Sequence, residues 1–89
     1  MERKFSLGGI TATRQTFKYI SQQEMLSALQ RHGSGDWGDC CPADRAANDV
    51  ALREGFRLFS VYHSHEGRKF WVVTEAERWL TTVILAEDF

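Results

Sequence analysis

The sequence contains little that a secreted or membrane-inserted protein needs. Its two cysteines, Cys40 and Cys41, are adjacent, so they cannot close a large loop with a disulfide inside one chain. No apolar run approaches the roughly 18 residues of a membrane span, and the start of the chain lacks the apolar stretch of a secretion signal. We therefore expect a cytoplasmic protein with reduced thiols and no membrane partner.

The chain also lacks an excess of positive charge. It carries 11 basic and 12 acidic residues, for a net charge of −1. A protein whose main task is to grip phosphate normally has a strong excess of lysine and arginine, so nucleic acid is not the favoured partner. Residues 1–31 hold five basic and two acidic side chains, whereas residues 32–54 hold two basic and five acidic ones. The acidic middle is thus the one polarised segment.

The first half of the chain predicts one strand and three helices. The length of 89 residues leaves room for a single domain, residues 1–89. Residues 3–13 are typical of a strand that paired glycines weaken. The first helix is expected to begin at Thr13 or Arg14. A capping box of Ser21 and Glu24 begins the second, and Pro42 and Gly55 mark the start and the end of the third.

The second half of the chain changes to the period of strands. Residues 56–63, 69–74 and 80–85 are β-branched and aromatic runs separated by turn signals, which predicts an antiparallel meander. We expect an α+β fold with a four-stranded, mostly antiparallel sheet, in the order β-α-α-α-β-β-β, with the helices packed on one face. The strand residues predicted for the core are Leu58, Val61, Phe70, Val72, Val83 and Leu85.

Apolar side chains occupy both faces of the predicted strands. Three short helices can cover only one face of a small sheet, and a bare second face would expose more apolar surface than soluble monomers usually tolerate. We therefore predict that a partner protein or a second copy of the chain covers the other face. The side chains predicted to lie there are Tyr62, Trp71 and Trp79.

The segment between Gly33 and Cys41 is a glycine-rich and aspartate-rich loop with an indole at its centre. Trp37, flanked by Asp36 and Asp39, is either a plug that pins the loop to the domain or an anchor for a partner. Both interpretations make the loop ordered, and the sequence leaves them open.

The carboxylates of Asp36, Asp39 and Asp44, joined by Glu75 and Glu77, could form a Mg²⁺ site of a nuclease. Helix capping and turn chemistry explain the same residues without a metal. We favour capping, and expect no cofactor and no catalytic residue.

Cys40 and Cys41, with His32 or with His63 and His65, have the atom types of a zinc site. Adjacent cysteines seldom chelate one tetrahedral ion, and the two later histidines flank a predicted hairpin tip. A cysteine nucleophile would need a base, and no base is tied to either thiol by sequence. We therefore expect no metal.

The predicted meander contains both aromatic and basic side chains. A stacking platform for single-stranded nucleic acid uses such residues on a sheet. Aromatic side chains in strands more often pack in a core, so this function stays an alternative. The residues concerned are Phe59, Tyr62, Phe70 and Trp71, with Arg57, Arg68 and Lys69.

Specific motifs cover nearly the whole chain: Leu7-Gly-Gly-Ile-x-Ala-Thr, Arg31-His32, Gly35-Asp-Trp-Gly-Asp, Asp44-Arg, Ala47-Asn-Asp, Arg57-Leu-Phe-Ser-x-Tyr, Phe70-Trp-Val-Val-Thr-Glu-Ala-Glu-Arg and Thr81-Thr-Val-Ile-Leu. Through them the chain resembles a family of small bacterial accessory proteins of plasmids and other mobile elements, commonly labelled plasmid-related or type I restriction subunit M. The restriction label does not fit, because 89 residues cannot hold a methyltransferase fold. The chain departs from the family at its end and at the bulky Trp79-Leu80.

The resemblance implies a setting on mobile DNA. Together with the small size and with an acidic segment from Asp36 to Asp49 that could occupy a basic nucleic-acid site, it favours a non-catalytic protein-binding module, such as one that interferes with a host nuclease defence (restriction or CRISPR). Two other classes stay open: a small nucleic-acid-binding protein or Mg²⁺-dependent nuclease, and a structural homodimer without a separate ligand. The residues predicted to contact a partner are Asp36, Trp37, Asp39, Asp44, Tyr62, Trp71 and Trp79.

Overall fold

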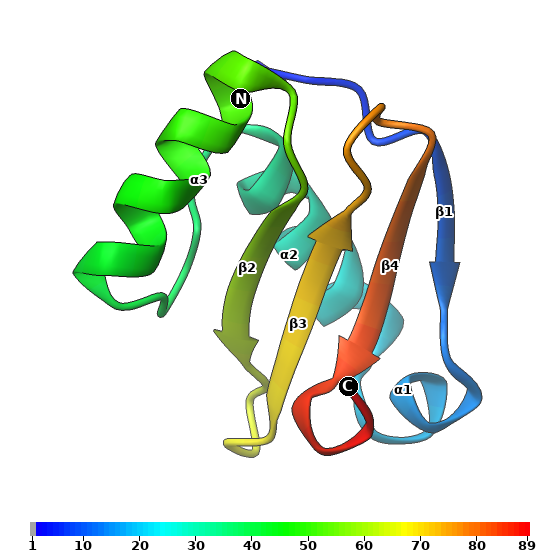
Figure 1. Cartoon of the computed structure of the whole chain (residues 1–89). Helices are drawn as coiled ribbons and strands as arrows, with labels where there is room; N and C mark the ends of the chain where they lie inside the picture. Colours follow the sequence, from blue (N-terminus) through cyan, green and yellow to red (C-terminus); the bar gives the residue numbers. More distant parts are fainter. Residues whose placement is uncertain (1) are drawn as a thin grey trace.

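The computed structural model describes residues 2–89, which form three α-helices and one four-stranded sheet (Figure 1). This confirms the α+β prediction and the order of its elements. The strand order is β1-β4-β3-β2, with β1 parallel to β4 and the other neighbours antiparallel. In chain order the elements are β1 (Gly9–Ala12), α1 (Arg14–Tyr19), α2 (Gln22–Gly33), α3 (Pro42–Glu54), β2 (Leu58–His63), β3 (Lys69–Thr74), β4 (Leu80–Leu85) and the short 3-10 turn η1 (Ala86–Asp88).

The limits of the two longer helices follow from local hydrogen bonds. Ser21 and Glu24 form the predicted capping box, each side chain accepting from the backbone N–H of the other at 3.1 Å. The second carboxylate oxygen of Glu24 accepts from the backbone N–H of His65 in the β2–β3 turn, which ties α2 to the sheet. α3 begins at Pro42 and ends at Gly55, whose φ of 81° is left-handed. Among residues 2–89 no helix is long and apolar enough to cross a membrane.

The main core lies between α2 and one face of the sheet (Figure 1). From α2 it receives Met25, Ala28 and Leu29. Val61 belongs to a second cluster with Cys40, beside β2. The strand residues predicted for the core are all exposed by 5% or less: Leu58, Val61, Phe70, Val72, Val83 and Leu85.

The outer edge of β2 is covered by α3 and by the loop before it. The Asn48 side chain accepts from the backbone N–H of Phe59 at 3.1 Å and donates to the carbonyl of Phe59 at 2.6 Å, as a neighbouring strand would. Val61 pairs in the same way with the loop, donating to the Trp37 carbonyl at 3.2 Å and accepting from the Asp39 N–H at 2.7 Å. This edge is therefore closed to another strand.

Asn48→Asp is expected to lower the free energy of unfolding by about 2–4 kcal/mol, measured by urea denaturation. Asp has the shape of Asn but no N–H to donate, so a carboxylate would face the Phe59 carbonyl at a site that is 1% exposed. The neighbouring change Asp49→Asn keeps an oxygen for the Trp37 indole and is the matched control, expected to stay within about 0.5 kcal/mol. Equal stabilities of the two variants would contradict the strand-like role of Asn48.

Candidate functional site

Trp37 is buried, as the plug interpretation of its loop requires. Its ring is 4% exposed and packs on Phe5, with ring centroids 6.3 Å apart and an angle of 25° between the rings. The indole Nε1 donates to Oδ1 of Asp49 on α3 at 3.0 Å. Trp37 therefore joins the loop, the N-terminal segment and α3, and it does not reach a partner unless the loop opens.

Tyr62 is also withdrawn from the predicted partner surface, because it lies in the main core and is 3% exposed. Its hydroxyl donates to the backbone carbonyl of Asp36 at 2.7 Å, and the Arg31 guanidinium lies 4.8 Å from its ring centroid. Burial raises the pKa of the Tyr62 hydroxyl well above its ordinary value. The Tyr62 side chain thus fixes the loop that contains Asp36 to the sheet.

The three aspartates predicted to contact a partner lie apart and have local roles. Asp36 accepts two hydrogen bonds from the Arg31 guanidinium, at 2.8 and 3.3 Å, and these lower the pKa of its carboxyl. Asp39 lies 2.8 Å from Nδ1 of His63, and Asp44 stands in the first turn of α3. Among residues 2–89 no three side chains of the metal-binding types gather into one site.

Trp71 and Trp79 do not share a surface with Tyr62. Trp71 pairs with Val61 across the β2–β3 ladder, so it points to the face opposite Tyr62. Trp79 precedes β4 in a turn and is 64% exposed. The prediction that the three side chains lie on one face is therefore wrong, because Tyr62 belongs to the α2 side.

A buried chain of hydrogen bonds runs through His32, which is fully buried on α2. Its Nδ1 lies 2.5 Å from Ser60 Oγ and its Nε2 lies 2.8 Å from Thr74 Oγ1. Thr74 continues to Thr81 at 2.7 Å, and the Thr81 hydroxyl donates to the carbonyl of Leu7 at 2.7 Å. This series of hydrogen bonds crosses all three meander strands and ends at the segment before β1.

The carbonyl at the end of this chain fixes the tautomer of His32. Because Thr81 donates to a carbonyl, it must accept from Thr74, and Thr74 must then accept from Nε2–H. Nδ1 is left without a proton and accepts from the Ser60 hydroxyl. Burial and the charge of Arg78 lower the pKa of His32 from 6.5 to about 3, so the ring is neutral. A histidine sealed in this way organises the core and meets no substrate.

The two cysteines differ in burial. Cys40 is buried, its Sγ lies 3.7 Å from the Phe59 carbonyl, and burial raises the pKa of its thiol. Cys41 is exposed at the start of α3. Neither thiol hydrogen-bonds a histidine within the part of the chain that the structure describes, so a nucleophile and base pair is not formed.

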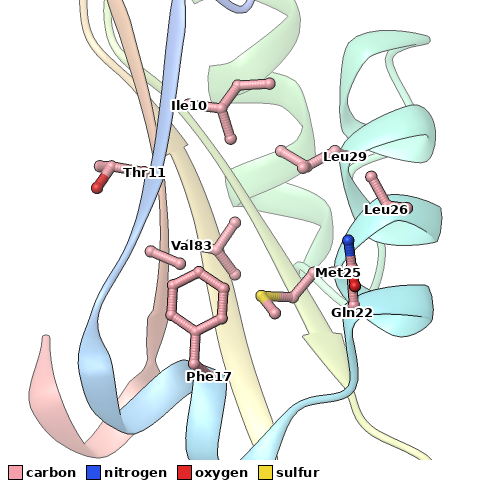
Figure 2. A pocket seen from close by; sticks show the side chains of 9 residues that line it. Ile10, Thr11, Phe17, Gln22, Met25, Leu26, Leu29 and Val83 are labelled. Atoms are coloured by element: carbon pink, nitrogen blue, oxygen red, sulfur yellow. The ribbon is translucent and has the colours of Figure 1, made fainter.

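An apolar groove of about 150 Å³ lies between β1 and α2, with α1 at one end (Figure 2). Its floor is apolar, and its rim exposes Ile10 by 53%, Phe17 by 64% and Leu26 by 54%. Figure 2 shows Ile10 pointing across the groove toward α2, while Thr11 points away. No charged side chain lines it: the residues are Ile10, Thr11, Ala12, Phe17, Gln22, Met25, Leu26, Leu29 and Val83.

The strand beside this groove has a free edge. Gly9 and Thr13 donate backbone hydrogen bonds to β4, to the carbonyls of Trp79 and Val83, at 3.0 and 3.3 Å. Backbone groups alternate in direction along a strand, so Thr11 faces β4 like Gly9 and Thr13, whereas the N–H and C=O of Ile10 and Ala12 point away from β4. β1 is at the end of the strand order, and within residues 2–89 no strand pairs with its outer side.

The helix at the end of the groove, α1, carries two basic side chains. Arg14 and Lys18 are four residues apart on α1, on either side of Phe17 along the chain, and the first turn of α1 holds no acidic residue. Neither side chain takes part in the ion pairs formed among residues 2–89. The groove is thus an apolar slot beside an open strand edge, with basic side chains at one end.

Comparisons with known proteins identify no relative of this chain. No family model matches the chain, and searches among curated proteins and among solved structures find no match either.

Proposed function

We propose that this chain is a non-catalytic protein-binding module that acts in the cytoplasm and binds an extended segment of its partner along β1. The observation that carries the proposal is an unpaired strand edge beside an apolar groove with three large exposed side chains. Its buried histidine and cysteine are used in packing, which supports binding rather than catalysis. The resemblance to mobile-element accessory proteins supports a partner in a host nuclease defence.

Strand addition explains why the edge and the groove occur together. A peptide laid antiparallel or parallel to β1 would hydrogen-bond the free N–H and C=O of Ile10 and Ala12. Every second side chain of that peptide would turn toward α2. A volume of about 150 Å³ admits one side chain of the size of a phenyl ring, which would contact Phe17 and Leu26. Main-chain bonds would supply affinity, and this single anchor would supply specificity.

Charge indicates the composition of the bound segment. Arg14 and Lys18 are like charges four residues apart on a helix of six residues, where they repel each other mildly. An acidic residue next to the anchor would relieve that repulsion and form ion pairs at the end of the groove. We therefore propose a segment with one leucine or phenylalanine and neighbouring acidic residues. Asp36 and Asp39 of the acidic middle segment are engaged within the chain and are not needed for this contact.

The test uses synthetic decapeptides with one phenylalanine among β-branched and acidic residues, with binding followed by fluorescence anisotropy. We expect binding, and slower exchange of the Ile10 and Ala12 amides in the complex. Peptides with lysine in place of the acidic residues should bind at least tenfold more weakly, and a proline that removes one pairing N–H should abolish binding.

Leu26→Glu is the groove variant, and Val50→Glu is its matched control on α3, where the replaced side chain is 41% exposed and lies outside the groove. Leu26→Glu should lose peptide binding while keeping a wild-type circular dichroism spectrum, and Val50→Glu should bind like the wild type. Binding that survives Leu26→Glu, or binding without protection of the β1 amides, would overturn the proposed mode.

A further inference from the structure

The face of the sheet opposite α2 carries an aromatic cluster. The Trp71 ring lies between Phe59, at a centroid distance of 5.2 Å, and Phe89, which stacks on it at 5.1 Å and 15°. Phe89 is 59% exposed. These rings border a hollow of about 320 Å³, whose further walls are Arg57 and Val73. We call this surface, with these five residues, the Trp71 face.

The segments that form the Trp71 face carry basic and acidic side chains in equal number: Arg57, Arg68 and Lys69 against Glu75, Glu87 and Asp88. Two ion pairs close within the chain, Arg57 with Glu75 at 3.6 Å and Arg68 with Glu87 at 2.8 Å. Lys69 lies with its Nζ 5.7 Å from the Trp71 ring centroid. Neither Lys69 nor Asp88 belongs to an ion pair formed among residues 2–89, which leaves one cation and one anion at this rim.

We propose that a second copy of the chain covers the Trp71 face. In a twofold interface the same patch meets itself, so each charge must find its opposite on an identical surface. A rim with three basic and three acidic side chains meets that condition, with Lys69 of one copy facing Asp88 of the other. The basic end of the β1–α2 groove does not, because two copies would oppose cations there. Two sheets can pack face to face in this way with their aromatic side chains interdigitated.

Sedimentation equilibrium from micromolar to millimolar protein tests the proposal. The mass of the wild type should approach that of two chains as the concentration rises. Phe89→Ser should raise the dissociation constant at least tenfold, because it removes a large apolar side chain from the interface. Phe17→Ser is the matched control: its ring is 64% exposed, against 59% for Phe89, and lies in the groove. It should leave the mass unchanged.

A charge exchange tests the pairing across the interface. Lys69→Glu and Asp88→Lys should each weaken the dimer, and the double variant should recover most of the loss. Both side chains are exposed, so neither change should alter thermal unfolding of the dilute protein by much.

Three results would overturn the proposal. One is a wild type that stays monomeric at the highest concentration. Another is a dimer that persists in both Phe89→Ser and Lys69→Glu. The third is retention of the protein by a single-stranded oligonucleotide that Phe89→Ser abolishes, which would assign the rings to bases instead. Dimerisation is read from mass and strand addition from peptide binding, so either proposal can fail without the other.

Discussion

Gly38→Ala is expected to lower the free energy of unfolding by about 4 kcal/mol or more, a large part of the 5–15 kcal/mol of an ordinary domain. Gly38 has a φ of 69° and forms a bridge with Val61 of β2. An added Cβ would overlap the Val61 carbonyl oxygen and approach the Tyr62 ring. The loop could accommodate it only by leaving the strand, which would break two backbone hydrogen bonds and expose Trp37.

A second variant separates two contributions to this loss of stability: the strain of a left-handed alanine and the steric overlap of its Cβ. Gly67, in the β2–β3 turn, has a φ of 85°, and a Cβ there would meet nothing within 4 Å. Gly67→Ala should therefore cost only the roughly 1–2 kcal/mol of a left-handed alanine. Urea unfolding followed by tryptophan fluorescence gives both values. Similar losses in the two variants would show that the loop moves away from β2 without cost.

Elements whose causes are local could be predicted from the sequence. The capping box of Ser21 and Glu24, and the frame of Pro42 and Gly55, each act within one turn of helix, so they appear where expected. The meander follows from three runs with a period of two and from the turn before Lys69. The first strand is shorter than predicted, four residues of the expected eleven. Its glycine at position 8, with a φ of 66°, abuts the backbone of Trp79 and ends the pairing.

The faces of the strands could not be assigned from the sequence. Alternation places Tyr62 and Trp71 on opposite sides, but both parities are apolar, so only the position of α2 decides which one is buried. Two of the candidate partner residues therefore lie on different faces of the sheet. Tyr62 lies in the core on the α2 side, and Trp71 lies on the opposite face. The closing of the β2 edge by a loop bridge at Gly38 is a pairing between distant segments, which no local pattern shows.

The β1–α2 groove was missed because its rim comes from three separate elements. The spacing of Met25, Leu26 and Leu29 predicts one apolar stripe on α2, but only Met25 and Leu29 are buried and Leu26 is 54% exposed. Phe17 on a short basic helix is a similar exception. An apolar residue outside the buried stripe marks a helix that has a second contact surface.

The stability of the domain is expected to fall as the pH is lowered from about 7 to about 5, by about 2 kcal/mol, because His32 cannot take up a proton in the folded state. In the unfolded chain the ordinary pKa of histidine is 6.5, whereas burial and the charge of Arg78 lower the pKa of folded His32 to about 3. Above pH 6.5 both states are neutral and the stability is complete. Below that value the unfolded state binds the proton and the folded state does not, so stability is lost until the pH reaches about 3.

The loss of stability between pH 7 and pH 5 is caused by His32 if it disappears when His32 is replaced. Glu24 and Asp36 also have lowered pKa values, through hydrogen bonds from the His65 amide and from Arg31, but their ordinary values of 4.5 and 3.8 lie below this window. His32→Gln should be less stable at neutral pH, since it disturbs the bonds to Ser60 and Thr74, yet its stability should change little between pH 7 and pH 5.

His63→Gln is the matched control, because it removes an exposed histidine that pairs with Asp39 on the surface. That variant should keep the steep loss of stability toward low pH, measured as the urea midpoint in a series of buffers. The same steep loss in His32→Gln would show that another group binds the proton on unfolding. A flat profile in the wild type would show that the buried hydrogen-bond chain accepts a charged imidazole, with Ser60 turning its hydroxyl to receive Nδ1–H.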